Sequence, residues 1–139
     1  MDRFGGALAR VEASYKSLFA FRDKYVQGAP IFGHAYDYAI PNGVGAPCGV
    51  GPWLQPSLEY CGYNDLNTGR AIVRSALEKF RDLLTNLAAE PLNNFHLIDT
   101  QGTLTDDNLW GNELHPTGDG FSQIADKFRA AVNSHFGTV

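Results

Sequence analysis

His115 is the residue of this chain best placed for acid–base chemistry. It lies in a polar loop, directly before Pro116 and just ahead of a predicted helix. Histidine titrates near neutral pH, so an imidazole in such a loop can accept a hydroxyl proton and return it to a leaving group. A lone loop histidine more often bonds the backbone or caps a helix, and for His115 taken alone that interpretation stays open.

The residues around His115 resemble the histidine block of the SGNH (GDSL-type) hydrolases. The matching positions are Trp110, residues 112–117, Gly120, Phe121, Ile124 and Ala125. A predicted strand ending at Asp99 leads into this block, and a fainter match extends back through residues 31–38 and 51–54. The resemblance covers the carboxy-terminal half of that family. It implies hydrolysis of an acyl or acetyl ester, with carbohydrate esters among the candidate substrates and His115 as the general base.

The chain departs from this family at its nucleophile. Neither a Gly-Asp-Ser tripeptide nor a Gly-x-Ser-x-Gly elbow occurs in the sequence. Five serines fall on predicted helices and Ser57 lies in a long loop, where local capping explains it. We therefore expect the isolated chain to be inactive as an esterase. The alternative is a non-catalytic module that binds a ligand or partner through its long loops.

The acid that supports the histidine is also altered. The family places Asp three residues before its histidine, and this chain has Asn112 there. An amide oxygen can orient the ring but brings no charge to stabilise the imidazolium. Asp107 ranks first as an acid that substitutes for it in space, ahead of Asp106, Glu113 and Asp37.

Three further residues are candidates for substrate contact. His34 and Asp37 lie near the carboxyl end of a predicted strand, where ligands collect in open α/β sheets, although a strand-end pair with its hydrogen bonds satisfied inside the protein is the favoured interpretation. Trp110 could line an acyl or sugar site, although packing under the loops is its simpler role. Residues 62–65 match the family block that holds the oxyanion, but a turn before the next helix is the favoured interpretation, since residues 56–61 make a poor central strand.

The predicted elements place these residues on an α/β fold. Apolar spacing predicts a helix over residues 6–27, a buried strand over 30–38, helical turns near 53–60, and a helix with Ile72 to Leu87 on its apolar face. A second strand follows at 95–99, and a last helix starts after Thr117 as N-cap. This order predicts parallel strands with crossover helices in a single domain over residues 1–139, a partial form of the three-layer flavodoxin-like SGNH architecture.

Composition and charge exclude some classes of binding partner. The net charge is −4, and no Lys/Arg stripe that would favour nucleic acid occurs. No apolar run is long enough to cross a membrane, and residues 1–20 show no signal peptide, which leaves the compartment open. Cys48 and Cys61 could close a short disulfide loop or remain free thiols, and free thiols are favoured. Without histidines at ligand spacing, no metal site and no cofactor are expected. In a partial fold the strand at 31–38 has an open edge, so we expect a homo-oligomer through that edge.

Overall fold

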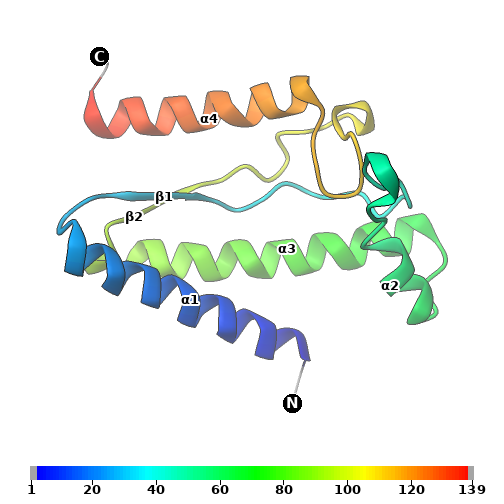
Figure 1. Ribbon diagram of the computed structural model, residues 1–139, viewed down its shortest axis with the longest axis horizontal. Coiled ribbons are helices and arrows are strands. Elements are labelled where there is room, and N and C mark those ends of the chain that lie inside the picture. The colour runs from blue at the N-terminus through cyan, green and yellow to red at the C-terminus, as the bar shows by residue number, and fades with distance from the viewer. Residues whose placement is uncertain (1–2, 138–139) are drawn as a thin grey trace.

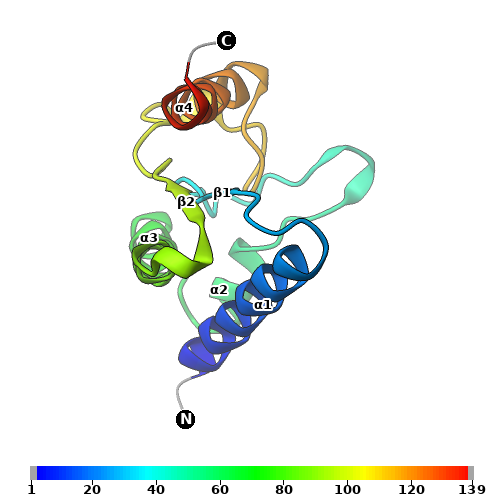
Figure 2. The same cartoon turned by 90° about the vertical axis from the view of Figure 1, so that its left-hand side faces the viewer.

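The computed structural model describes residues 3–137, and a two-stranded parallel sheet lies at its centre. β1 (Ile31–His34) pairs with β2 (Phe95–Ile98) in the register Ile31↔Phe95 to His34↔Ile98. Helix α4 (Gly118–Phe136) covers one face of the sheet, and α1 (Arg3–Tyr25) with α3 (Leu66–Ala89) covers the other (Figures 1 and 2). The α/β class and the parallel pairing are thus as predicted.

Helix α3 is the crossover between the two strands. Asp65 caps its start by accepting a hydrogen bond from the Thr68 N–H at 2.8 Å. Its apolar face buries Leu84 and Leu87 against Phe19 of α1 and Phe95 of β2. Because Asp65 caps the chain there, the helix begins at Leu66, six residues before Ile72, where the apolar repeat begins.

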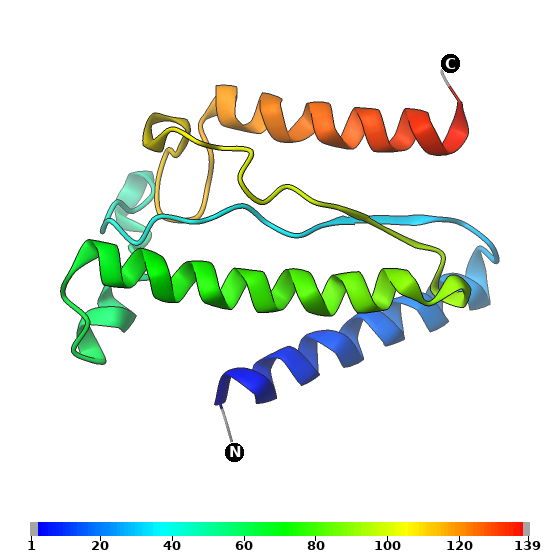
Figure 3. The ribbon, with the colours of Figure 1, turned by 180° about the vertical axis from the view of Figure 1, so that it is seen from behind.

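A second hydrophobic cluster lies beyond the carboxyl ends of the strands. Its buried members are Ala39, Ile40, Leu104 and Trp110, all from the loops that follow β1 and β2. These two loops therefore pack against each other, and they form the base on which the His115 loop rests. Seen from behind, both leave the sheet at the same end of the molecule (Figure 3).

The strand predicted over residues 30–38 is shorter than expected. It ends at His34 because Tyr36 adopts a left-handed backbone with φ of 60°, which a strand cannot contain. Its residues are half-buried instead of buried. The connection that follows contains a 3-10 helix (Pro47–Gly49) and α2 (Gln55–Tyr60), which confirms helical turns in this region.

The last helix begins as predicted. Thr117 is its N-cap and accepts a hydrogen bond from the Gly120 N–H at 3.3 Å. The apolar spacing of this helix also predicts a buried face with Phe121, Ile124 and Phe128. Phe121 is exposed and the other two are half-buried, because a two-stranded sheet is too narrow to cover that face. Within residues 3–137, no helix is long and apolar enough to cross a membrane. Cys61 is a free, exposed thiol, as expected.

A group of aromatic rings packs between the sheet and the carboxyl end of α4. The His96 and His135 rings are in contact at 4.3 Å between centroids, and Phe32 stacks on His96 at 5.0 Å. Desolvation, and then the neighbouring His135, lower the pKa of His96, and burial lowers the pKa of His34. The folded protein therefore disfavours the protonated form of both rings.

These two histidines make stability depend on pH. An unfolded histidine titrates near pH 6.5 and the folded rings titrate lower, so the unfolded chain binds more protons as the pH falls. The stabilisation is complete above about pH 6.5 and is lost below it. We expect the urea midpoint to fall between about pH 7.5 and about pH 5. His96→Gln should flatten the fall, and His135→Gln should flatten it less; an unchanged slope in His96→Gln would contradict this account.

Candidate functional site

The His115 ring is held by its own loop. The Asn112 side-chain oxygen accepts hydrogen bonds from the Leu114 and His115 N–H groups, both at 2.9 Å, and contacts His115 Nδ1 at 3.0 Å. Asn112 is buried, whereas His115 is exposed. An amide oxygen only accepts, so Nδ1 carries the hydrogen and Nε2 keeps its lone pair. That tautomer leaves Nε2 as a proton acceptor.

The loop around this ring is closed by backbone bonds. The Gly111 and Asn112 N–H groups donate to the His115 carbonyl at 2.8 and 3.2 Å. The Thr117 N–H donates to the Leu109 carbonyl at 2.8 Å, and Gly120 lies so close to that carbonyl that a Cβ would meet it at 2.5 Å. The loop and the start of α4 therefore form one tightly packed unit that presents the His115 side chain.

A pocket of about 120 Å³ adjoins His115 at the carboxyl end of β1. The residues that line it are His34, Tyr36, Asp37, Leu104, Trp110, Leu114, His115, Pro116, Phe121 and Ile124. The predicted site residues His34, Asp37, Trp110 and His115 thus come together, and Asn112 supports the ring from its own loop. No Ser, Thr or Cys stands among the described residues of the lining.

Tyr36 is a pocket residue that sequence reasoning missed. Its backbone is left-handed, and its hydroxyl donates to the Leu114 carbonyl next to His115. Burial raises the pKa of this phenol. A non-glycine residue at positive φ is strained, by about 1 to 3 kcal/mol, and persists only where its surroundings hold it. Its sequence context carries no signal for this conformation.

His34 is held as a neutral ring. Its Nδ1 accepts the Tyr36 N–H at 3.2 Å and contacts Thr100 Oγ1 at 3.3 Å. A ring nitrogen that accepts a backbone N–H carries no hydrogen of its own, so Nε2 is the protonated position. His34 can therefore donate one hydrogen bond through Nε2 and is not a second base.

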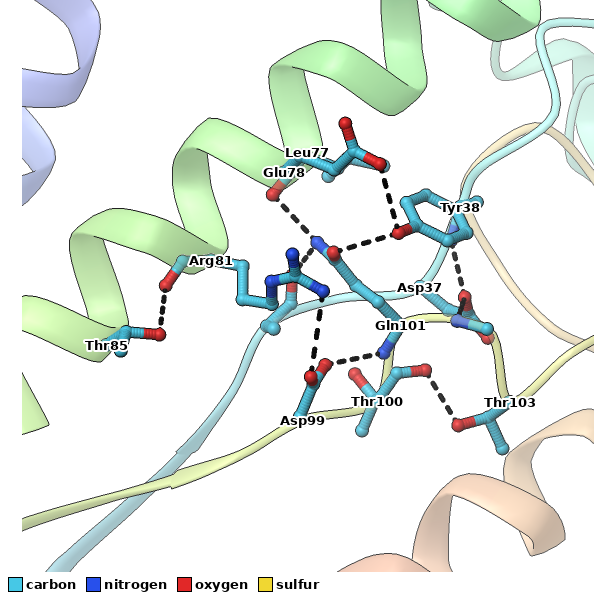
Figure 4. A network of polar contacts seen from close by, with 12 residues as sticks. Asp37, Tyr38, Leu77, Glu78, Arg81, Thr85, Asp99, Thr100, Gln101 and Thr103 are labelled. Carbon is cyan, nitrogen blue, oxygen red and sulfur yellow. Dashed lines mark hydrogen bonds and ion pairs between the residues drawn. The ribbon is translucent and has the colours of Figure 1, made fainter.

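Asp37 has a structural role at the same edge. Its carboxylate is buried and accepts from the Tyr38, Gly102 and Leu104 N–H groups at 2.6 to 2.7 Å. Figure 4 shows the surrounding network, in which Gln101 Nε2 donates to the Leu77 carbonyl of α3 at 2.7 Å. Asp37 thus fastens the loop after β2 to the end of β1, and its oxygens are already occupied.

Glu113 was ranked only as a substitute acid, and the structure assigns it a different role. It is fully buried, and its two carboxylate oxygens accept four backbone N–H groups at 2.5 to 3.0 Å. The donors are Gly43, Trp53, Leu54 and Gln55. This clamp brings the long loop to the histidine, so the Trp53 ring meets the His115 ring edge to face, 6.0 Å between centroids.

Asp107 lies elsewhere. It is exposed and forms an ion pair with Arg70, which lowers the pKa of the Asp107 carboxyl. In the described structure, His115 Nδ1 bonds to Asn112. Asp107 therefore does not act as the carboxylate that orients this histidine. Residues 62–65 follow α2 and lead into the Asp65 cap, which matches the favoured interpretation of a turn.

Four of the serines, Ser57 of α2 among them, donate to a nearby carbonyl of their own helix region. Ser14, Ser17 and Ser122 each donate to the carbonyl four residues earlier in their helix, and Ser57 donates to the Trp53 carbonyl. The described structure shows no group of three or more His, Cys, Asp or Glu side chains that could hold a metal ion. The arrangement can therefore bind a small apolar group and accept one proton at Nε2 of His115.

No protein-family model, no curated protein sequence and no solved structure matches this chain.

Proposed function

We propose that this chain carries the histidine part of an SGNH-type ester-hydrolase site. The single observation that supports it is the state of His115: Nδ1 is fixed by Asn112 Oδ1 at 3.0 Å, and the free Nε2 belongs to a ring on the wall of an apolar pocket. A base of this kind serves acyl transfer, where a hydroxyl proton must be removed and then returned to the leaving alcohol. The resemblance of the surrounding block to those hydrolases agrees with this role.

The pocket favours a short acyl group as its occupant. Leu104, Trp110, Leu114 and Ile124 supply apolar walls, and a volume of about 120 Å³ suits a group of a few carbon atoms. Trp53, against the His115 ring, marks the side where the alcohol part of the ester would lie. An aromatic face there would also accept a sugar ring, which keeps carbohydrate esters among the substrates.

The nucleophile is the missing part. The only hydroxyl in the described lining is that of Tyr36, which is engaged by the Leu114 carbonyl and has a raised pKa. Asn112 orients the ring without a charge, so the imidazolium receives no electrostatic help from it. In this proposal His115 moves the proton, and an attacking hydroxyl must come from outside the pocket.

This arrangement predicts that the isolated chain hydrolyses esters only very slowly. The isolated chain should hydrolyse p-nitrophenyl butyrate no faster than free imidazole at equal concentration, because a base without a placed nucleophile gains little. His115→Gln should remove most of that small rate. The rate is measured from p-nitrophenolate release, with Glu90→Gln as a surface control that changes nothing. Turnover well above imidazole, abolished by a serine-directed phosphonate, would reveal a nucleophile that we have missed.

The acyl pocket is tested separately by binding. Butyrate titrated into labelled protein should shift the NMR signals of Leu104, Trp110 and His115 together, and Ile124→Trp should block these shifts by filling the pocket. Shifts confined to surface lysines and arginines would contradict a pocket for an acyl group.

The lack of a nucleophile also favours one alternative. A pocket with apolar walls, a neutral His34 and no hydroxyl free to react suits a non-catalytic module that binds a small ligand. The two functions differ at His115. A binding module tolerates His115→Gln with its ligand affinity little changed, whereas an ester-hydrolase part loses its proton transfer.

A further inference from the structure

The outer edge of β1 is unpaired. Ile31 and Ala35 donate toward β2, to the carbonyls of Asn94 at 3.0 Å and Ile98 at 3.2 Å. Backbone groups alternate in direction along a strand, so the N–H and C=O groups of Phe32 and His34 point away from β2. Within residues 3–137 the sheet has two strands, and no strand lies on that side.

An edge of this kind needs a cover. The helices cover both faces of this sheet, as is usual for parallel strands, but they do not pair with the backbone groups of its outer edge. Unpaired N–H and C=O groups on a flat, uncharged edge are a template for another strand. β1 (Ile-Phe-Gly-His) has no charged residue and no proline that would blunt it.

We propose that a second copy of this chain pairs with β1 in antiparallel orientation, about a two-fold axis through Gly33. In this register Phe32 faces the second copy's His34, and His34 faces its Phe32. Each of these is a hydrogen-bonded pair, so the edge gains four N–H···O bonds. Gly33 then faces its own copy at the close, non-hydrogen-bonded position, where Cα atoms approach to about 4.5 Å.

The surface beside this edge supports a second copy as the partner. Leu18, Phe21 and Tyr25 recur at helical spacing on α1 and are 45 to 62% exposed; we call them the α1 stripe. Glu12 and Lys16 lie on another side of α1, where they line a groove with Leu83 of α3. The stripe therefore faces away from α3, on the side of the open strand edge. Its three residues are uncharged, and among the described residues the one cation in contact with them is Lys24, whose Nζ lies over the Tyr25 ring at 5.0 Å.

The loop after β1 also extends toward the open side of the sheet (Figure 2). Val44 and Val50 are exposed on this loop, and Figure 2 shows it extending past β1 on the side away from β2. An antiparallel two-fold axis brings the carboxyl end of one β1 to the amino end of the other, where α1 ends at Tyr25 and the exposed Val26 follows. The axis thus places the exposed end of each α1 beside the carboxyl end of the other copy's β1, and the same surface of both copies takes part, as an isologous contact requires.

Charge sets the expected salt dependence. Each chain carries a net charge of −4, so two copies repel each other at long range, while the contact itself buries no charged strand residue. Salt screens that repulsion and strengthens apolar burial, so association should tighten between about 0.05 and 0.5 M salt. This inference rests on the strand edge and not on the ester-hydrolase proposal.

Sedimentation equilibrium of the whole chain from 1 to 100 µM tests the proposal. We expect a mass that rises toward twice 15.2 kDa, and at least a tenfold weaker association for Phe21→Glu. Leu92→Glu is the control, since Leu92 is also apolar and is 92% exposed against 62% for Phe21, but lies away from the edge and the stripe. A monomer mass at every concentration would overturn the proposal, as would equal weakening by both variants.

Amide hydrogen exchange on the unmodified protein tests the register without any variant. The Phe32 and His34 amides should become protected as concentration rises, whereas the Gly33 amide, which faces β2, should be protected throughout. A dimer in which the Phe32 and His34 amides exchange as fast as in the monomer would place the contact elsewhere and overturn the strand pairing.

Discussion

Glu113→Ala is expected to lower the free energy of unfolding by about 4 kcal/mol, one of the two largest effects predicted for a single residue of this protein. Four backbone N–H groups, those of Gly43, Trp53, Leu54 and Gln55, lose their shared acceptor in this variant. Bonds to a charged acceptor contribute roughly 1.5 to 3 kcal/mol each, and water entering the half-buried loop recovers part of the loss. Urea denaturation at one protein concentration measures the change.

Two further variants serve as a graded substitution and as a surface control. Glu113→Gln keeps one acceptor oxygen but turns an NH2 group toward the remaining donors, so we expect about half the loss. Glu90→Ala, at an exposed glutamate, should stay within about 0.5 kcal/mol of the unmodified protein. If Glu113→Ala behaved like Glu90→Ala, the carboxylate would not hold the loop.

Loss of the Glu113 clamp should also change the surroundings of the His115 ring. Trp53 reaches the His115 ring because its N–H and that of Leu54 are bound by one Glu113 oxygen. In Glu113→Gln we expect the ring-current shift of the His115 protons to shrink while the Asn112 contact to Nδ1 remains. A loss of stability without any change at His115 would separate the clamp from the site.

Trp110→Ala is expected to cost about 4 kcal/mol, within the range of roughly 3 to 5 measured for large aromatic residues in protein cores. The Trp110 side chain is 9% exposed and packs with Ala39, Ile40 and Leu104. Removal of the indole leaves a cavity beside the pocket, and the smaller side chains of Ala39, Ile40 and Leu104 cannot fill it. Tyr60→Ala, at a 93% exposed aromatic residue, is the control and should change stability little.

Trp110 was first considered as a substrate contact, and this variant distinguishes the two roles. If the indole is mainly core, stability falls and Trp110→Phe restores much of it. If it is mainly a ligand contact, stability holds while the butyrate shifts in the pocket disappear. The structure favours the core, because the buried indole joins both strand-end loops.

Local sequence determined most of the helices and the order of elements. The 3.6-residue spacing along α3 and the Thr117 cap of α4 identify these helices without any tertiary contact, because backbone bonds and caps act within a few residues. The two strands with a crossover helix between them also follow from the chain order. The end of β1 does not, since Tyr36 at positive φ is imposed by packing with loops far along the chain.

At the candidate site, the sequence by itself identified His115 and its neighbour Asn112, three residues away in the same loop. It did not reveal Glu113 as a clamp, because its four donors lie 58 to 70 residues earlier in the chain. A buried carboxylate and an exposed one look alike in sequence. What separates them is whether distant backbone N–H groups converge on the oxygens to replace the lost water, and only the tertiary structure decides that.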